Sequence, residues 1–403
     1  MKALVVGAGF AGAVVARELA EAGWEVLVID KRNHVGGNAF DYINAAGIRV
    51  HKYGPHLWHG NSDMAQEWVS RFTEWVPYKH YVHAQLPNGQ HVPLPINRAT
   101  IETVFKEELI RLFGPTYTDE HIKGLMVMKR VEHPEITNSR QLMEASVGRE
   151  LTELFFAPYT KKMWDMDLAD LPASVAGRIP TKDDYDPYYF PKDKYQFLPK
   201  GGYEALFLKI FDHPNIQVST STRREELPQF YSGKGFVKHV PGWEPTKFDV
   251  IFSSEPIDTY YNCDLGELPW RSIKFKTITL PIPRALSAPV VNFTHDGPCT
   301  RVTEWKQLPA HGGNPYATTL TFEEPCDYKS NDMQRYYPVK TSHVVDPNRE
   351  LYKRYRERAK KDGIHFIGRC GRYAYLDMQP CVNSTLTQIR AFLSGDQIPA
   401  VDL

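Results

Sequence analysis

The first thirty residues contain the sequence feature that most constrains the fold. An apolar run over 2–6 is followed by a segment with helical apolar periodicity that ends at Gly23, and a second apolar run over 24–29 ends on Asp30. Three glycines in the spacing G-x-G-x-x-G lie between the first run and the helical segment: Gly7, Gly9 and Gly12. These features follow the order of a βαβ unit: a strand, a glycine turn, a helix, a second strand and an acid. The sequence therefore predicts a Rossmann-like α/β fold.

These glycines predict a binding site for a dinucleotide. Gly7 allows the tight turn, Gly9 lets the backbone approach a pyrophosphate, and Gly12 lets the helix pack closely on the strand. The helix N-terminus offers unpaired N–H groups to the phosphates, and Asp30 can accept a hydrogen bond from a ribose hydroxyl. A secretory signal is the rival interpretation of this apolar start, but its basic region is the single Lys2 and the glycines interrupt its apolar core.

Two tracts that follow this unit resemble the UDP-galactopyranose mutase family. The first is D-K-R-x-H-x-G-G-N-A-x-D over 30–41, in which a cation followed by a glycine pair suits a second phosphate contact; the second is Y-G-P-H-x-W-H over 53–59. The resemblance implies FAD as the cofactor and places His59 beside the flavin ring. It implies further cofactor contacts from Lys31, Gly37, Asn38 and His56.

Composition excludes several classes of function. The 48 basic and 48 acidic residues cancel, so no global field draws the protein toward nucleic acid or an anionic membrane. The five cysteines show no C-x-x-C pair, which argues against a disulfide framework and a zinc site and fits a reducing cytoplasm. No third ligand accompanies the two histidines of 53–59, so we expect no metal. No apolar run approaches the ~18 residues that span a bilayer, so we expect no membrane span.

A hairpin and a helical insert are predicted in the middle of the chain. Two short runs within 81–96 flank an Asn-Gly pair, which is typical of a β-hairpin. Apolar residues over 101–113 then recur with helical spacing and stop at Gly114, and weaker helical stretches cover 119–130 and 141–156.

The aromatic tract F-x-x-P-Y-T-x-K-x-W closes this insert over 155–164. A helix that breaks at Pro158 would leave aromatic and hydroxyl side chains along one concave side. Such an aromatic group is more often core than nucleotide pocket. The tract is similar, however, to the uridine-binding signature of the mutase family. The resemblance therefore implies substrate contacts from Phe155, Tyr159, Thr160 and Trp164.

The next segment, 171–180, has prolines near both ends and small residues between them, which indicates a loop that can move. An arginine in such a loop is usually a solvated surface charge. In the mutase family the matching segment is a mobile lid whose arginine reaches the diphosphate of the substrate. The resemblance thus assigns this role to Arg178 and a substrate contact to Tyr189.

The second half of the chain predicts a return to the first domain and then an antiparallel sheet. A helix over 203–211 and strands over 216–220 and 248–253 restore the βα rhythm. Beyond Leu265 the strand-like runs have no helices between them: 273–280, 290–294, 300–305 and 318–322. Single arginines on strands are usually exposed members of ion pairs. The resemblance instead implies substrate contacts from Arg271, Asn292, Arg301 and Tyr337.

A glycine turn after a strand, and an acid before a helix, lie near the end of the chain. The tract matches the family's G-R-x-x-x-Y-x-Y-L-D-M over 368–378, although the family often has a larger residue at Ala374. Flavin folds hold ring and ribityl atoms at a helix N-terminus of this kind. The resemblance implies a substrate contact from Tyr375 and cofactor contacts from Arg369, Asp377 and Met378.

We expect three domains from these patterns. A discontinuous Rossmann-like FAD-binding domain comprises 1–78, 195–262 and 338–403. A helical domain with the uridine-binding edge covers 97–172. An antiparallel sheet domain with the mobile substrate loop comprises 79–96, 173–194 and 263–337.

The resemblance implies a flavin-dependent isomerase that interconverts UDP-galactopyranose and UDP-galactofuranose through a flavin N5–sugar adduct on reduced FAD. Its catalytic residues would be Arg178, Arg301 and His59. It would also use a reductant such as NAD(P)H, act in the cytoplasm as a homo-oligomer such as a dimer, and supply galactofuranose for cell-surface glycans. Two other classes stay open: an FAD-dependent amine oxidase or dehydrogenase, which needs an electron acceptor, and a nucleotide-binding module without turnover.

Overall fold

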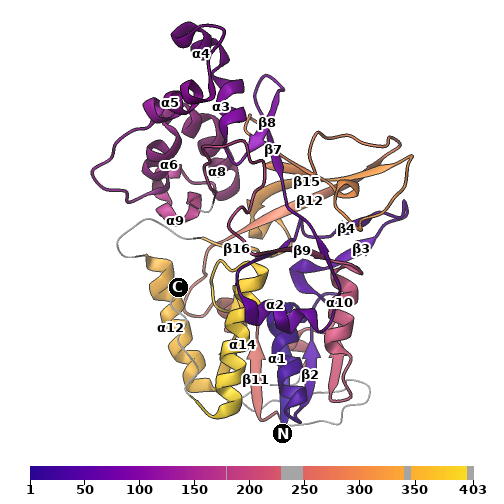
Figure 1. Cartoon of the computed structure of the whole chain (residues 1–403). Helices are drawn as coiled ribbons and strands as arrows, with labels where there is room; N and C mark the ends of the chain where they lie inside the picture. Colours follow the sequence, from indigo (N-terminus) through magenta and orange to yellow (C-terminus); the bar gives the residue numbers. More distant parts are fainter. Residues whose placement is uncertain (178, 228–247, 340–345, 397–403) are drawn as a thin grey trace.

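The structure is a computed structural model that describes residues 1–177, 179–227, 248–339 and 346–396. Three regions are visible in Figure 1. A parallel sheet flanked by helices lies near the N-terminus, a cluster of helices lies at the far end, and a second sheet lies between them. The prediction of a Rossmann-like domain with an inserted helical region and a largely antiparallel sheet is confirmed. The exact division into three domains stays a prediction.

The first sheet has five parallel strands in the order β10-β2-β1-β11-β17. The three central strands read as nearly continuous apolar runs because both faces of the sheet are covered. The strands are β1 (Lys2–Val6), β2 (Glu25–Ile29), β10 (Ile216–Ser219), β11 (Val250–Ser253) and β17 (Ile364–Phe366).

Helices pack on both faces of this sheet. Ala3 and Val5 of β1 face one core, whereas Leu4 and Val6 face the other, as the two-residue period of a strand requires. The helices of the first face are α1 (Phe10–Glu21), α2 (Asp63–Ser70), α10 (Gly202–Phe211) and α14 (Met378–Ser394). Those of the second face are α11 (Ile257–Tyr260) and α12 (Pro347–Asp362), while the short α13 (Gly368–Gly371) precedes α14.

The second sheet has seven strands in the order β16-β12-β15-β14-β13-β7-β8. Every neighbouring pair is antiparallel except β7 and β13, which are parallel because the hairpin β7–β8 joins the sheet from a distant part of the chain. The strands are β7 (Val82–Gln85), β8 (His91–Leu94), β12 (Trp270–Leu280), β13 (Val290–Phe293), β14 (Arg301–Glu304), β15 (Thr318–Asp327) and β16 (Tyr337–Pro338).

Two smaller sheets and several short helical turns connect these layers. A hairpin joins β3 (Asp41–Ile43) to β4 (Arg49–His51), and a three-stranded sheet contains β5 (Trp58–Gly60), β9 (Tyr195–Pro199) and β6 (Trp75–Pro77). The 3₁₀ turns are η1 (Gly37–Ala39), η3 (Leu168–Asp170), η4 (Arg224–Glu226), η5 (Trp305–Gln307) and η6 (Tyr328–Ser330).

The helical region packs its apolar face on the β7–β8 hairpin and β13. The helix predicted over 101–113 is divided at Phe105 into two shorter helices. The elements are α3 (Arg98–Val104), α4 (Lys106–Phe113), α5 (Asp119–Lys129), α6 (Ser139–Val147), α7 (Arg149–Leu151), the π-helical turn η2 (Thr152–Phe156), α8 (Ala157–Trp164) and α9 (Ala173–Ala176).

The predicted helix break at Pro158 is wrong. The chain stays helical from Arg149 to Trp164, and Pro158 lies in the first turn of α8, directly after the π-helical turn. Proline has no N–H to donate, so a position at the start of a helix, after a local change of helical pitch, accommodates it. Phe155 and Tyr159 therefore lie on one uninterrupted helical segment.

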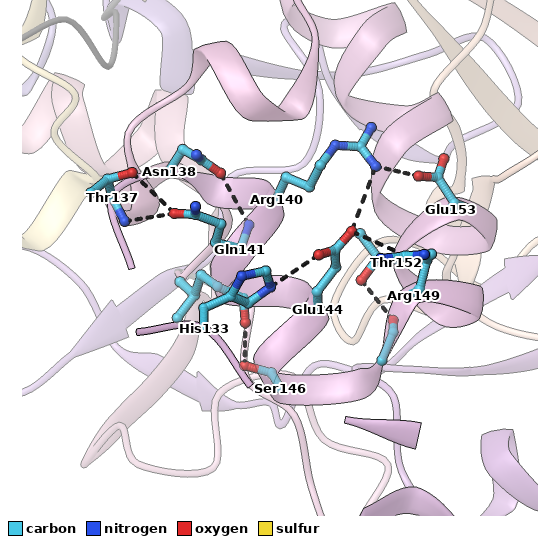
Figure 2. Close-up of polar contacts among 12 residues, drawn as sticks. His133, Thr137, Asn138, Arg140, Gln141, Glu144, Ser146, Arg149, Thr152 and Glu153 are labelled. Atoms are coloured by element: carbon cyan, nitrogen blue, oxygen red, sulfur yellow. Dashed lines mark hydrogen bonds and ion pairs between the residues drawn. The ribbon is translucent and has the colours of Figure 1, made fainter. Parts of the chain in front are cut away.

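A polar cluster around the buried Glu144 connects α6 to the segment that carries this aromatic tract. Glu144 lies 3.0 Å from His133 Nε2 and 3.9 Å from both Arg140 and Arg149. Figure 2 shows that Arg140 lies between Glu144 and Glu153, with which it forms a further ion pair. A buried carboxylate needs such partners, and we assign the cluster a structural role in positioning the helix that precedes α8.

Two buried histidines support the 53–59 loop. His51 Nδ1 accepts a hydrogen bond from the His56 N–H (3.1 Å), so its proton is on Nε2 and is donated to His311 Nε2 (2.9 Å). His311 Nδ1 then donates to the carbonyl of Pro309 (2.8 Å). Burial lowers the pKa of His311 to about 4 and lowers that of His51 as well. Both rings are therefore neutral in the folded protein.

We expect the free energy of unfolding to fall as the pH is lowered from the ordinary histidine pKa of about 6.5 to about 4. In this window the unfolded chain binds protons that the folded chain excludes, so acid favours unfolding. Urea unfolding at about pH 7 and about pH 5 measures the loss. The free energy of unfolding of His311→Gln should fall less between the two pH values than that of the wild-type protein. An equal fall in both proteins would contradict the conclusion that His311 is buried as a neutral ring.

Candidate active site

Two glycine turns meet at the N-terminus of α1. Gly7 has φ +103°, and a Cβ there would lie 2.0 Å from Ser254 Oγ. A Cβ on Gly12 would lie 1.8 Å from the carbonyl oxygen of Gly7, so this position requires glycine for close packing of helix and strand. A Cβ on Gly9 would meet nothing nearer than Gly37 Cα at 3.6 Å, so the protein leaves room there.

The second turn, at Gly36 and Gly37, lies directly against the first. Gly36 N–H donates to the carbonyl of Ala8 (2.9 Å), and both glycines have positive φ. Together with the N–H groups at the start of α1, whose N-cap Gly9 has no side chain, the turns form a cradle of backbone that suits a pyrophosphate. The described residues thus fit a dinucleotide.

Asp30 has a structural task that the sequence does not reveal. Its Oδ2 accepts a hydrogen bond from Ala8 N–H and its Oδ1 from Arg32 N–H, both at 2.8 Å. Arg32 Nη1 donates to Asn38 Oδ1 (2.9 Å), whereas Lys31 is exposed. Arg32 therefore contacts Asn38, the residue after the second glycine turn, and the role expected for Lys31 stays a prediction.

The N-terminus of α14 carries the second predicted cofactor segment. Met378 is its first residue, and the Asp377 carboxylate at the N-cap lies 3.8 Å from Arg369 Nη2. Arg369 Nε donates to the carbonyl of Leu376 (2.8 Å), and its guanidinium lies over the Tyr375 ring at 5.0 Å. This segment therefore joins the predicted cofactor residues to the aromatic wall of the site.

A cavity of about 160 Å³ lies between the helical region and the second sheet. Six residues that the sequence singled out line it: His59, Phe155, Tyr159, Tyr189, Asn292 and Arg301. They come from β5, η2, α8, the loop before β9, β13 and β14, which are far apart in the chain. His80 and Phe190 also line the cavity, and no sequence signal marked them.

Arg301 is a half-buried cation in the wall of this cavity. Its Nε lies 2.8 Å from Glu323 Oε2, and only 1% of the Glu323 side chain is exposed. Burial alone would lower the pKa of the guanidinium, but the Glu323 carboxylate reverses this effect and raises it. Arg301 is thus an ion-pair member, as is usual for an arginine on a strand, but its partner is a buried carboxylate at the wall of a cavity.

Burial keeps Tyr159 and His80 of the cavity neutral, and likewise the nearby His56. It raises the pKa of Tyr159 to about 12, so the phenol stays a hydrogen-bond donor. It lowers the pKa of His80 to about 3 and that of His56 to about 4. Asn292 Oδ1 is buried and has no hydrogen-bond partner among the described residues, so it can accept from a ligand.

The remaining aromatic residues form a cluster at the end of α8. The ring of Trp164 lies 6.3 Å from that of Tyr337 and 6.4 Å from that of Tyr375, and the two tyrosine rings stack at 5.4 Å. Thr160 is buried on the same helix. Arg271 donates from Nε to the carbonyl of Met163 (2.9 Å) and from Nη2 to that of Lys162, so the structure places it as support for α8.

Arg178, the arginine of the predicted mobile loop, lies outside the described residues. In the part of the chain that the structure describes, no group of three or more His, Cys, Asp or Glu side chains could hold a metal ion. Within the same part, no helix is both long and apolar enough to cross a bilayer.

The parallel sheet, the two glycine turns and the cavity define a Rossmann-like flavoprotein fold. A profile of NAD(P)-binding Rossmann-like domains matches residues 5–73, and a profile of UDP-galactopyranose mutases matches residues 154–375. The chain belongs to the UDP-galactopyranose mutase family.

Similarity to this family extends over almost the whole chain. A probable UDP-galactopyranose mutase from Klebsiella pneumoniae is 33% identical over 97% of this chain and 94% of its own length. A dTDP-fucopyranose mutase from Escherichia coli is 31% identical over 98% of this chain and 99% of its own length. A crystal structure of reduced UDP-galactopyranose mutase has the same fold, with a TM-score of 0.71 at 16% identity over 98% of this chain and 94% of that one.

Proposed function

We propose that the protein interconverts UDP-galactopyranose and UDP-galactofuranose on bound FAD. The observation that carries this proposal is the half-buried, ion-paired Arg301 in the wall of a cavity. Aromatic rings lie beside it, as does Asn292 Oδ1, which has no partner among the described residues. A nucleotide sugar needs a cation for its diphosphate, rings for its base and acceptors for its hydroxyls. Family membership supports the same assignment.

In the proposed reaction the chain's own residues bind and orient the substrate. Arg301, together with Arg178, would stabilise the negative charge that develops on the leaving diphosphate. Tyr159 would donate a hydrogen bond to the substrate from its phenolic O–H. Tyr337, Tyr375 and Trp164 would hold the base and sugar in place. Reduced FAD, held by the two glycine turns and the α14 N-terminus, would supply the nucleophilic N5 for the covalent route.

The surrounding biology is part of the proposal. We infer that a reductant such as NAD(P)H keeps the flavin reduced, that the enzyme works in the cytoplasm as a homo-oligomer, and that its product supplies galactofuranose for cell-surface glycans.

A visible spectrum and a product assay test the function together. Purified protein should show flavin absorption bands that dithionite bleaches, and only the bleached form should convert UDP-galactofuranose to UDP-galactopyranose. Stoichiometric consumption of an electron acceptor would instead favour an amine oxidase or dehydrogenase, and UDP binding without turnover would favour a binding module.

One relative, from Escherichia coli, is a dTDP-fucopyranose mutase, so a dTDP-fucose sugar is a second candidate substrate that can be tested. The ratio of kcat/KM for UDP-galactofuranose to that for dTDP-fucofuranose decides between them. A ratio below one would mean that the dTDP-fucose sugar is the preferred substrate, while the reaction would still be a mutase reaction.

We expect Trp164→Ala to raise KM for the nucleotide sugar roughly tenfold with little change in kcat. Stacking of a base on an aromatic ring contributes about 1–3 kcal/mol, and its loss affects ground and transition states equally. Steady-state kinetics on the reduced enzyme provide the measurement. Trp164→Phe is the matched control, because it keeps a ring next to Tyr337 and should retain most of the affinity. A large fall in kcat at unchanged KM would assign Trp164 to the chemistry instead.

A further inference from the structure

His59 forms a short contact with an acid that the proposed reaction does not use. Its Nδ1 lies 2.7 Å from Asp193 Oδ2, and the two side chains are 19% and 21% exposed. His59 is in β5 and Asp193 lies just before β9, whose strand pairs with β5 so that His59 faces Gln196 in register. The pairing of these strands brings the two side chains together.

One further contact defines the orientation of the imidazole. The ring stacks on Phe190, with centroids 3.8 Å apart and planes 12° apart, and it lines the cavity that contains Arg301. Because Nδ1 is held by Asp193 and one ring face by Phe190, Nε2 is the nitrogen left to meet a ligand. Nε2 has no hydrogen-bond partner within the residues that the structure describes.

The acid determines which nitrogen carries the proton. An ionised carboxylate can only accept hydrogen bonds, so His59 Nδ1 must be the donor in this pair. In the neutral ring, Nε2 is then an acceptor. The cavity already contains donors, in Arg301 and Tyr159, and Asn292 Oδ1 as another acceptor. A sugar with several hydroxyl groups needs acceptors as well as donors.

We propose that Asp193 is a positioning residue that holds His59 in the Nδ1–H tautomer, so that the unprotonated Nε2 accepts a hydrogen bond from a hydroxyl of the substrate sugar. This inference rests on the proposed function, because it takes a nucleotide sugar as the ligand. Asp193 does not contact the cavity's ligand in this account and acts only through His59.

A purely structural role for Asp193 makes different predictions. Its Oδ1 lies 3.5 Å from Asn61 Nδ2, and its carbonyl accepts from Gln196 Nε2 (3.2 Å), so the residue could merely anchor its loop. Loss of an anchor lowers the melting temperature without changing the tautomer of His59. The tautomer therefore separates the two roles.

The experiment uses Asp193→Asn and Asp193→Leu in the FAD-bound protein with ¹⁵N-labelled histidine. His59→Gln identifies the signals of His59, and the ¹⁵N shifts of its two ring nitrogens report the tautomer. The wild-type protein should show Nδ1–H, and Asp193→Leu should show a mixture of tautomers. In both variants kcat should fall about ten- to a hundredfold, with KM changing less.

Asp63→Asn is the matched control. It removes an exposed acid that pairs with Lys194 at 2.6 Å, in the same region but without contact to His59, and should change neither the tautomer nor kcat. An unchanged His59 tautomer in Asp193→Leu, or wild-type kcat in both Asp193 variants, would overturn the proposal. If the wild-type protein shows the Nδ1–H tautomer but no mutase turnover, the proposed function fails while the pairing of Asp193 with His59 stands.

Discussion

Replacing Gly9 by valine is expected to give a folded protein that purifies with at most about a tenth of the wild-type flavin. Gly9 has φ −82°, and a Cβ there would meet nothing nearer than Gly37 Cα at 3.6 Å, so the backbone accommodates a side chain. The added branch would, however, fill the space at the α1 N-terminus where a pyrophosphate must approach the N–H groups. The ratio of flavin absorbance to protein absorbance in the purified protein measures the loss.

Gly12→Val separates loss of cofactor from loss of fold. A Cβ at Gly12 would overlap the carbonyl oxygen of Gly7 at 1.8 Å, so this variant should lower the melting temperature even without FAD. Gly9→Val should melt near the wild-type apoprotein. A Gly9→Val protein with the full flavin ratio would show that the cofactor lies elsewhere.

The second large effect is expected from Arg301→Ala. Charge-assisted hydrogen bonds contribute about 1.5–3 kcal/mol each, so kcat/KM for UDP-galactofuranose should fall at least tenfold. The variant should also unfold more readily, because Glu323 would be left as a buried charge without its partner, at a cost of about 3–5 kcal/mol. Flavin content and reduction by dithionite should stay unchanged. Kinetics and urea unfolding measure the two effects separately.

The double variant Arg301→Ala/Glu323→Gln is the control for this prediction. It removes the stranded charge, so most of the lost stability should return while kcat/KM stays low. Arg301→Lys should restore activity only in part, since an ammonium cannot reproduce the planar fork of the guanidinium. Arg178→Ala should lower kcat/KM to a similar extent. Wild-type kcat/KM in Arg301→Ala would mean that this cavity does not bind the diphosphate.

Local patterns were enough to predict the first unit of the fold. Apolar periodicity and three glycines are enough to predict β1, α1 and β2. The structure confirms these elements and the tight contacts at Gly7 and Gly12. The hairpin β7–β8 was also predictable, because Asn88 and Gly89 specify its turn. Family motifs then singled out six residues that line one cavity, although no periodicity in the sequence indicates that they meet.

Contacts between distant segments were decided only by the tertiary structure. Arg301 is paired with Glu323 because β14 and β15 lie in a register that places them opposite one another. Asp193 meets His59 because β5 pairs with β9, and Arg32 reaches Asn38, next to the second glycine turn. Helix and strand periodicity, caps and turns act over a few residues, so a sequence specifies them directly. Ion pairs and tautomers depend on which strands become neighbours, and that is settled only when the whole core packs.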